Sequence, residues 1–148
     1  KTKKEKVAWL KDQDTDGLRM VIKSSFDPKK RWSLPTGDVP FTRNDAPAGT
    51  EHTDLHMEAK KLYHFIDGGN NAITQNKREN LFIQMLEGLQ ENDADVLVAA
   101  KDKSLHRKFK GLSDNVVKEA FNWTDEYMLN EGEKVVYPQT PGPASGPG

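Results

Sequence analysis

Three aspartates and a glycine stand close enough together to suggest cation binding. Asp12, Asp14, Asp16 and Gly17 match positions 1, 3, 5 and 6 of a D-x-D-x-D-G calcium loop. Closely spaced carboxylates can wrap a hard cation, but the last loop position, where calcium sites carry a bidentate glutamate, is Lys23. An Asp-rich turn between two helices explains the same residues, and we favour that interpretation.

Two histidines are the second candidate for metal binding. His52 and His56 are four residues apart, so a helix would place both on one face. The HExxH motif needs a glutamate directly after the first histidine, where this chain has Thr53. The chain has no cysteine, and it has no G-x-S-x-G motif or phosphate-binding glycine loop. We therefore predict a non-enzymatic protein with no catalytic residue, metal or cofactor.

Cations gather in two segments of the chain. Residues 1–31 have a net charge of +5 and residues 101–118 one of +4, within an overall charge of −1. Residues 32–100 carry −6 and residues 119–148 carry −4. Basic segments can attract nucleic acid or an acidic protein surface, but solvated helix ends explain them better.

We predict that the second basic segment, together with two cations of an upstream helix, binds the partner. These residues are Lys101, Lys103, Arg107, Lys108, Lys110, Lys77 and Arg78. A helix-loop-helix over residues 92–121 also suggests DNA binding. However, the helix at 113–121 exposes mainly Asp114, Asn115, Lys118 and Glu119, which offer little for reading base edges. Nucleic-acid binding, as the alternative, would therefore be limited to non-specific phosphate contacts.

These side chains must be positioned by helices, because apolar residues recur at helical spacing. The strongest pattern lies in residues 76–121, which predict three helices in a row. Asn76 and Glu79 predict a capping box at the start of the first helix. Its buried face is Leu81, Phe82, Met85, Leu86 and Leu89, with Leu86 central.

The other two helices of this stretch have equally clear starts. Asn92 is predicted to cap the second helix and Ser113 the third. The second helix should bury Val96, Leu97, Ala99 and Ala100, and the third Val116, Val117, Ala120 and Phe121.

Three further helices are predicted upstream. Thr2 and Glu5 form a capping box for the first, which would bury Val7, Ala8, Trp9 and Leu10. The second would turn Leu18, Val21 and Ile22 inward and end before Pro28. The third spans residues 51–67, ends at Gly68-Gly69, and would bury Leu55, Ala59, Leu62, Tyr63 and Ile66.

Residues 26–50 hold four of the eight prolines, which exclude a helix or a central strand. We predict an extended Pro-rich arm, ordered by Phe26, Trp32, Leu34 and Phe41, which pack on the helices. Residues 131–148 are predicted to be a flexible Pro/Gly-rich tail. The predicted fold is all-α, a compact single-domain bundle of about six short helices in residues 1–130 with the arm packed on it.

A series of sequence blocks between residues 1 and 123 has a recognisable order. The blocks are KTKKEKVAWL, LRMVIKSSFDP, W-x-L-P-x-G-x-x-P-F, NDAPAGTEH, KKLYHFI, KRENLFIQMLEGL, AAKDKSL and KGLSDNVVKEAFNW. In this order they resemble an uncharacterised family of small proteins encoded by large contractile-tailed phages, especially those that infect cyanobacteria. The resemblance implies a further segment before Lys1 and a protein made in an infected bacterial cell, but it implies no functional residue.

No apolar run approaches the roughly 20 residues that cross a membrane, so no membrane association is predicted. The first functional hypothesis is an interaction module that binds a phage or host protein in the cytoplasm of the infected cell. The alternatives are a nucleic-acid accessory protein and a structural component of the virion.

Overall fold

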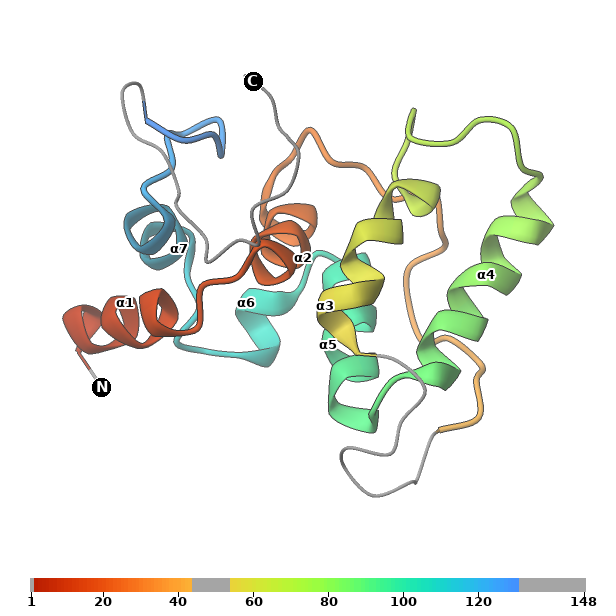
Figure 1. Ribbon diagram of the computed structural model, residues 1–148, viewed down its shortest axis with the longest axis horizontal. Coiled ribbons are helices and arrows are strands. Elements are labelled where there is room, and N and C mark those ends of the chain that lie inside the picture. Colours follow the sequence, from red (N-terminus) through yellow and green to blue (C-terminus); the bar gives the residue numbers. More distant parts are fainter. Residues whose placement is uncertain (1, 44–53, 131–148) are drawn as a thin grey trace, which may run out of the picture.

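The structure, a computed structural model, describes residues 2–43 and 54–130. Within these ranges the fold is all-α, as predicted: seven α-helices, one 3-10 helix and isolated β-bridges (Figure 1). The predicted tail at 131–148 and the arm residues 44–50 lie outside the described ranges. The elements are α1 (Lys3–Asp12), α2 (Asp16–Phe26), α3 (Leu55–Glu58), η1 (Ala59–Phe65), α4 (Gln75–Gly88), α5 (Glu91–Lys101), α6 (Leu105–Lys108) and α7 (Asp114–Phe121).

Helix α2 is the element on which most of the others pack. It contacts α3, η1, α5, α6 and α7, and its Val21 and Ile22 are almost completely buried. Helix α1 lies beside α7 at one end of the molecule, and α4 lies at the opposite end (Figure 1). The sequence pattern points to residues 76–121 as the organising stretch, yet the common packing partner is the shorter α2.

Two predicted helix starts are confirmed. Thr2 and Glu5 form the capping box of α1: the Thr2 hydroxyl accepts from the Glu5 amide at 3.1 Å, and the Glu5 carboxylate accepts from the Thr2 amide. The Ser113 hydroxyl accepts from the Val116 amide at the start of α7. In both cases the side chain supplies an acceptor to an amide that has no partner within the helix.

Two other predicted starts are wrong by two residues. Thr74 caps α4 in place of Asn76, and its hydroxyl accepts from the Lys77 amide at 3.1 Å. Gln90 caps α5 in place of Asn92, whose own amide donates to the Gln90 side chain at 2.9 Å. The two asparagines therefore lie inside the first turn, because an acceptor placed slightly earlier already satisfies the free amides.

The predicted buried faces of α4 and α7 agree well with the structure. Leu86 and Leu89 are 0% exposed, Phe82 and Met85 are buried, and only Leu81 remains half-buried. All four residues predicted for α7 are buried. Helix α5 differs slightly, because it buries Ala94 and leaves Val96 half-buried beside a surface groove.

The helix predicted for residues 51–67 has a different period from the one expected. After one α-helical turn, α3, the chain continues as the 3-10 helix η1. A 3-10 helix has three residues per turn, so Ala59, Leu62 and Phe65 share its buried face. The prediction that Tyr63 is buried is therefore wrong: it is 51% exposed, while Phe65 is 1% exposed. Gly68 then adopts a left-handed conformation, with φ 84°.

The Pro-rich arm packs on the helices, although its side chains are half-buried. Trp32 stacks on Phe65, meets the edge of Phe82, and donates its indole N–H to the Ser24 carbonyl at 2.9 Å. The backbone of Trp32 also forms an isolated bridge with Ile66. Leu34, Val39 and Phe41 rest against the core further along. Phe26 belongs to α2, so the arm begins one residue later than predicted.

We expect Gly17→Ala to lower the free energy of unfolding by about 1–2 kcal/mol, although alanine is usually more favourable than glycine in a helix. A Cβ on Gly17 would lie 2.9 Å from the His56 Cα and 2.6 Å from its Nδ1, so α2 and α3 would have to separate. Urea denaturation would measure the change, with the exposed Met20→Ala on the same helix as the control. A gain in stability would contradict this close approach.

Candidate functional site

An apolar groove of about 700 Å³ opens between α1, α2, α5 and the segment that runs from α6 to α7. Its buried lining residues are Leu10, Val21, Ile22, Leu105 and Val116. Its half-buried or exposed lining residues are Trp9, Leu18, Leu55, Val96, Phe109 and Leu112. Three charged residues, Lys6, Asp93 and Lys110, complete the lining together with Gly111. An apolar cleft with few polar groups is typical of a site that binds an apolar surface.

Two aromatic side chains in this groove are open to solvent. Trp9 is 56% exposed and Phe109 is 41% exposed. On α1 only Val7 and Leu10 are buried, so the prediction that Ala8 and Trp9 are also buried is wrong. Four consecutive helical residues span a full turn, so a single face cannot bury all of them. The periodicity of α1 therefore leaves Trp9 at the edge of the groove.

The groove also brings together the two basic segments of the sequence. Of its fifteen lining residues, six come from residues 1–31 and six from residues 101–118. Lys6 and Lys110 lie at the rim, one from each segment. The Lys6 stem runs close to Gly111, where a Cβ would lie 3.3 Å from its Cδ and Cε. Two segments that are far apart in the chain thus each contribute one cation to the described lining of one apolar groove.

Lys101 is the first of the seven predicted partner-binding cations, and it is buried. Its side chain is 1% exposed, and its ammonium donates to the carbonyls of Pro35 at 2.7 Å and Gly37 at 3.0 Å. Asp102 pairs with the same ammonium at 2.5 Å and accepts from the Gly37 amide at 3.0 Å. Lys101 and Asp102 thus form an arm clamp, and Lys101 offers no free charge to a partner in this conformation.

Two more of the seven cations bind backbone carbonyls. The Lys103 ammonium donates to the carbonyls of Ser24, Ser25 and Asp27 at the end of α2. Burial lowers the pKa of Lys103 below its ordinary value, and the charge of Asp27 opposes this shift. The Arg78 guanidinium donates to the carbonyls of His64 and Asn70, at 2.9 and 2.8 Å. Both side chains hold the chain together and leave little for external contacts.

The other four cations of the predicted set are exposed. Arg107, Lys108 and Lys110 follow one another at the end of α6, whereas Lys77 lies on α4. Helices α6 and α4 stand apart in the molecule (Figure 1). The structure thus gathers three of the predicted cations into one exposed group and places the fourth elsewhere.

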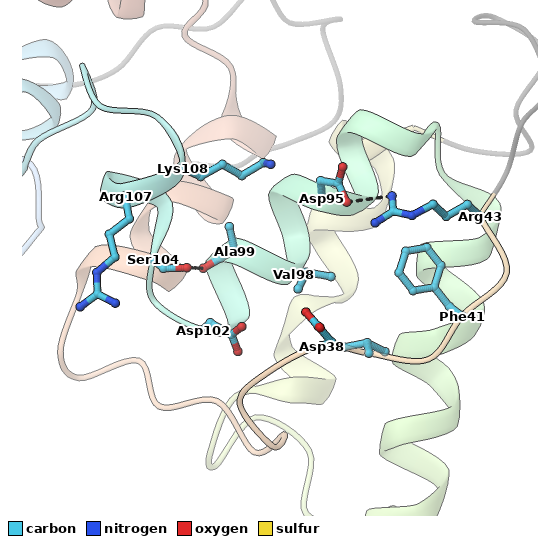
Figure 2. Close-up of a pocket in the computed structure, with 11 residues that line it drawn as sticks. Asp38, Phe41, Arg43, Asp95, Val98, Ala99, Asp102, Ser104, Arg107 and Lys108 are labelled. Carbon is cyan, nitrogen blue, oxygen red and sulfur yellow. Dashed lines mark hydrogen bonds and ion pairs between the residues drawn. The ribbon is translucent and has the colours of Figure 1, made fainter.

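A second groove, of about 630 Å³, separates the arm from α5 and α6. Figure 2 shows Arg107 and Lys108 on one side of it and the Arg43–Asp95 ion pair, 2.9 Å long, on the other. The lining contains three cations and three carboxylates, the latter being Asp38, Asp95 and Asp102. This charged groove has no net charge, which lowers its attraction for phosphate.

The two metal-binding candidates are dispersed. Asp12 ends α1, Asp16 begins α2, and Asp14 accepts two hydrogen bonds from Arg19 at 2.7 and 2.8 Å, as expected for a turn between helices. His56 is exposed on α3, and His52 lies outside the described residues. Within residues 2–43 and 54–130, no group of three or more His, Asp or Glu side chains is placed to hold a metal.

One further titratable cluster connects α7 to the segment that follows it. Asp114 accepts hydrogen bonds from the Tyr127 hydroxyl and from Lys118. Burial and the Asp114 hydrogen bond raise the pKa of Tyr127 to about 12. The pKa of Asp114 is lowered despite its partial burial, because Lys118 and Tyr127 donate to its charged form. The cluster fastens the segment after α7 to the first turn of that helix. None of its three residues lines either groove.

One residue of the sequence could have indicated the apolar groove, although a count of charges does not reveal it. Phe109 is a large apolar residue next to the end of the basic run from Lys101 to Lys110. A single exposed apolar residue is common on protein surfaces, so this signal gains weight only because Phe109 lines the same groove as Trp9. Part of the apolar groove lies within the residues that match a protein-family model. The family model matches residues 1–107, which include ten of the fifteen residues that line the apolar groove but not Phe109.

No helix in the described part of the chain is both long and apolar enough to span a membrane. No curated protein and no solved structure matches the chain. The family model covers well over half of the sequence, from α1 to α6. The chain therefore belongs to the Family of unknown function (DUF6433).

Proposed function

We propose that this protein is a non-enzymatic helical interaction module that binds another protein through its apolar groove. The observation that carries the proposal is the groove itself, which leaves Trp9 and Phe109 exposed above an aliphatic floor. Exposed aromatic side chains beside a preformed apolar cleft are typical of the residues that dominate binding energy at interfaces. In the described residues, the charged groove has four apolar lining residues beside six charged ones.

The partner, in this proposal, is a phage or host protein, and binding takes place in the cytoplasm of an infected bacterial cell. Its support is the resemblance of the sequence blocks to proteins of contractile-tailed phages. The other form of the proposal is a structural component of the virion. Mass spectrometry of purified particles separates the two, because only a virion component is retained in stoichiometric amounts.

We expect the double variant Trp9→Ala/Phe109→Ala to bind the partner about 30-fold more weakly, as for the loss of one interface hot spot or more. A photo-crosslinking amino acid at position 109, introduced in infected cells, should capture this partner. The affinity of the purified pair would then be measured by titration calorimetry for the wild type and the variant.

Tyr63 provides the matched control, because it is 51% exposed on η1 and does not line the groove. A crosslinker at position 63 should not capture the same partner, and Tyr63→Ala should keep the wild-type affinity. Equal capture from both positions, or an unchanged affinity in the double variant, would contradict groove binding. Both variants alter exposed side chains, so their unfolding midpoints should stay close to that of the wild type.

The exposed group Arg107, Lys108 and Lys110 supports a second candidate function, non-specific binding of nucleic acid. If these three cations contact phosphates of double-stranded DNA, log K should fall with log salt concentration with a slope of about −3. Fluorescence anisotropy with a labelled duplex at several salt concentrations would measure it. A slope of about −6 would show that cations outside this group also contact phosphates, and absence of binding at low salt would exclude this candidate.

A further inference from the structure

We infer that the segment received by the apolar groove is an amphipathic α-helix of another protein, whose apolar face is bordered by acidic residues. This inference rests on the proposed function and adds the chemistry of the partner. It combines the charge around the groove, the composition of its floor and the type of secondary structure that surrounds it.

The charge around the groove selects an acidic partner. Among the described lining residues, the cations are Lys6 and Lys110, and Asp93 is the one carboxylate. Lys6 comes from the basic segment 1–31 and Lys110 from the basic segment 101–118. Arg107 and Lys108 line the charged groove. Complementary charge at a rim accelerates association and rejects partners of the same sign.

The floor of the groove selects an aliphatic or aromatic face on the partner. Above the buried residues at its base, the groove exposes the half-buried Leu18, Leu55, Val96 and Leu112 and the exposed Trp9 and Phe109, all of them apolar. A nucleic-acid backbone would find no donor on such a floor, so the observations favour a protein. Helices that bind in grooves use apolar residues at positions i, i+3, i+4 and i+7, and they match a floor of this kind.

Two other occupants fit less well. An added β-strand needs an open sheet edge, and the described residues form only isolated bridges. A second copy of the chain in a two-fold contact would place the basic rim against the same basic rim, which is repulsive. An acidic helix meets neither obstacle.

The test is a selection from a displayed library of 16-residue helical peptides with random residues at eight positions. The bait is the full chain, and Trp9→Ala/Phe109→Ala serves for counter-selection. We expect the groove-dependent peptides to show apolar residues at i, i+3, i+4 and i+7, with Glu and Asp in excess of Lys and Arg on both flanks. The most enriched peptide should bind Lys6→Glu/Lys110→Glu about tenfold more weakly at low salt.

The outcomes separate the inference from the proposed function. Groove-dependent peptides with neutral or basic flanks, or an unchanged affinity for the charge-reversed variant, would overturn the acidic helix and leave groove binding in place. Peptides that bind both baits equally, or no enrichment at all, would overturn both. Self-association that the double variant abolishes, measured by analytical ultracentrifugation, would identify a second copy as the occupant and overturn the inference. Competition by an unlabelled DNA duplex for the groove would do the same in favour of nucleic acid.

Discussion

Replacing Leu86 by alanine is expected to lower the free energy of unfolding by about 2–5 kcal/mol. Leu86 is 0% exposed and lies in the middle of the buried face of α4. Its truncation removes the burial of several methyl groups and leaves a cavity in a core that is formed by short helices. Urea denaturation followed by circular dichroism would show the loss as a lower midpoint.

The matched control is Met128→Ala, because Met128 is 60% exposed. Its truncation should change the free energy of unfolding by less than about 0.5 kcal/mol. A midpoint for Leu86→Ala that equals the wild type would show that another face of α4 is buried. An unchanged slope of the urea transition in both variants would confirm that the comparison concerns the same folded and unfolded states.

Replacing Lys101 by methionine is expected to cost about 1.5–3 kcal/mol of stability, because the arm clamp loses its ammonium. Methionine keeps most of the aliphatic stem but leaves the Pro35 and Gly37 carbonyls without their donor. Asp102, which is partly exposed, loses its ion partner but keeps the Gly37 amide. The arm should therefore loosen locally before the helical core unfolds.

Limited tryptic digestion measures this loosening through cleavage after Arg31 and Arg43, which lie before and after Pro35 and Gly37 in the arm. We expect both cuts to be several-fold faster in Lys101→Met than in the wild type, under conditions where the core stays folded. Lys108→Met provides the control, since Lys108 is exposed and its ammonium lies 5.9 Å from the centroid of the Phe109 ring. Wild-type cleavage rates in Lys101→Met would show that the clamp does not hold the arm.

The local patterns of the sequence predicted much of the helical fold. Leu86 and Phe121 are buried because their neighbours repeat at a spacing that makes one apolar face. Ser113 caps α7 because no other side-chain acceptor closely precedes it. Asn76 does not cap α4, because Thr74, two residues earlier, already does so. Tyr63 was misplaced because periodicity alone does not separate a 3-10 helix from an α-helix over a few turns.

The candidate site was predicted poorly, because it depends on contacts between distant segments. Lys101 belongs to a run of cations that is typical of a solvated surface, and only the position of Pro35 and Gly37 shows that it is buried. The apolar residues of the groove each fit the pattern of a core position. Hydrophobic periodicity shows that a face is apolar, but not that a neighbouring helix fails to cover it.

The pairing of α1 with α7 determines when the apolar groove can form during synthesis of the protein. Helix α1 packs chiefly on α7, and residues 13–113 separate the two. A ribosome adds about 5–20 residues per second, so α1 waits for several seconds before its packing partner has been synthesised. The apolar groove, which Trp9 of α1 and Val116 of α7 both line, is therefore complete only after the chain as far as α7 has been synthesised. If the groove binds a partner as proposed, a nascent chain that lacks α7 should bind it more weakly than a chain that includes α7.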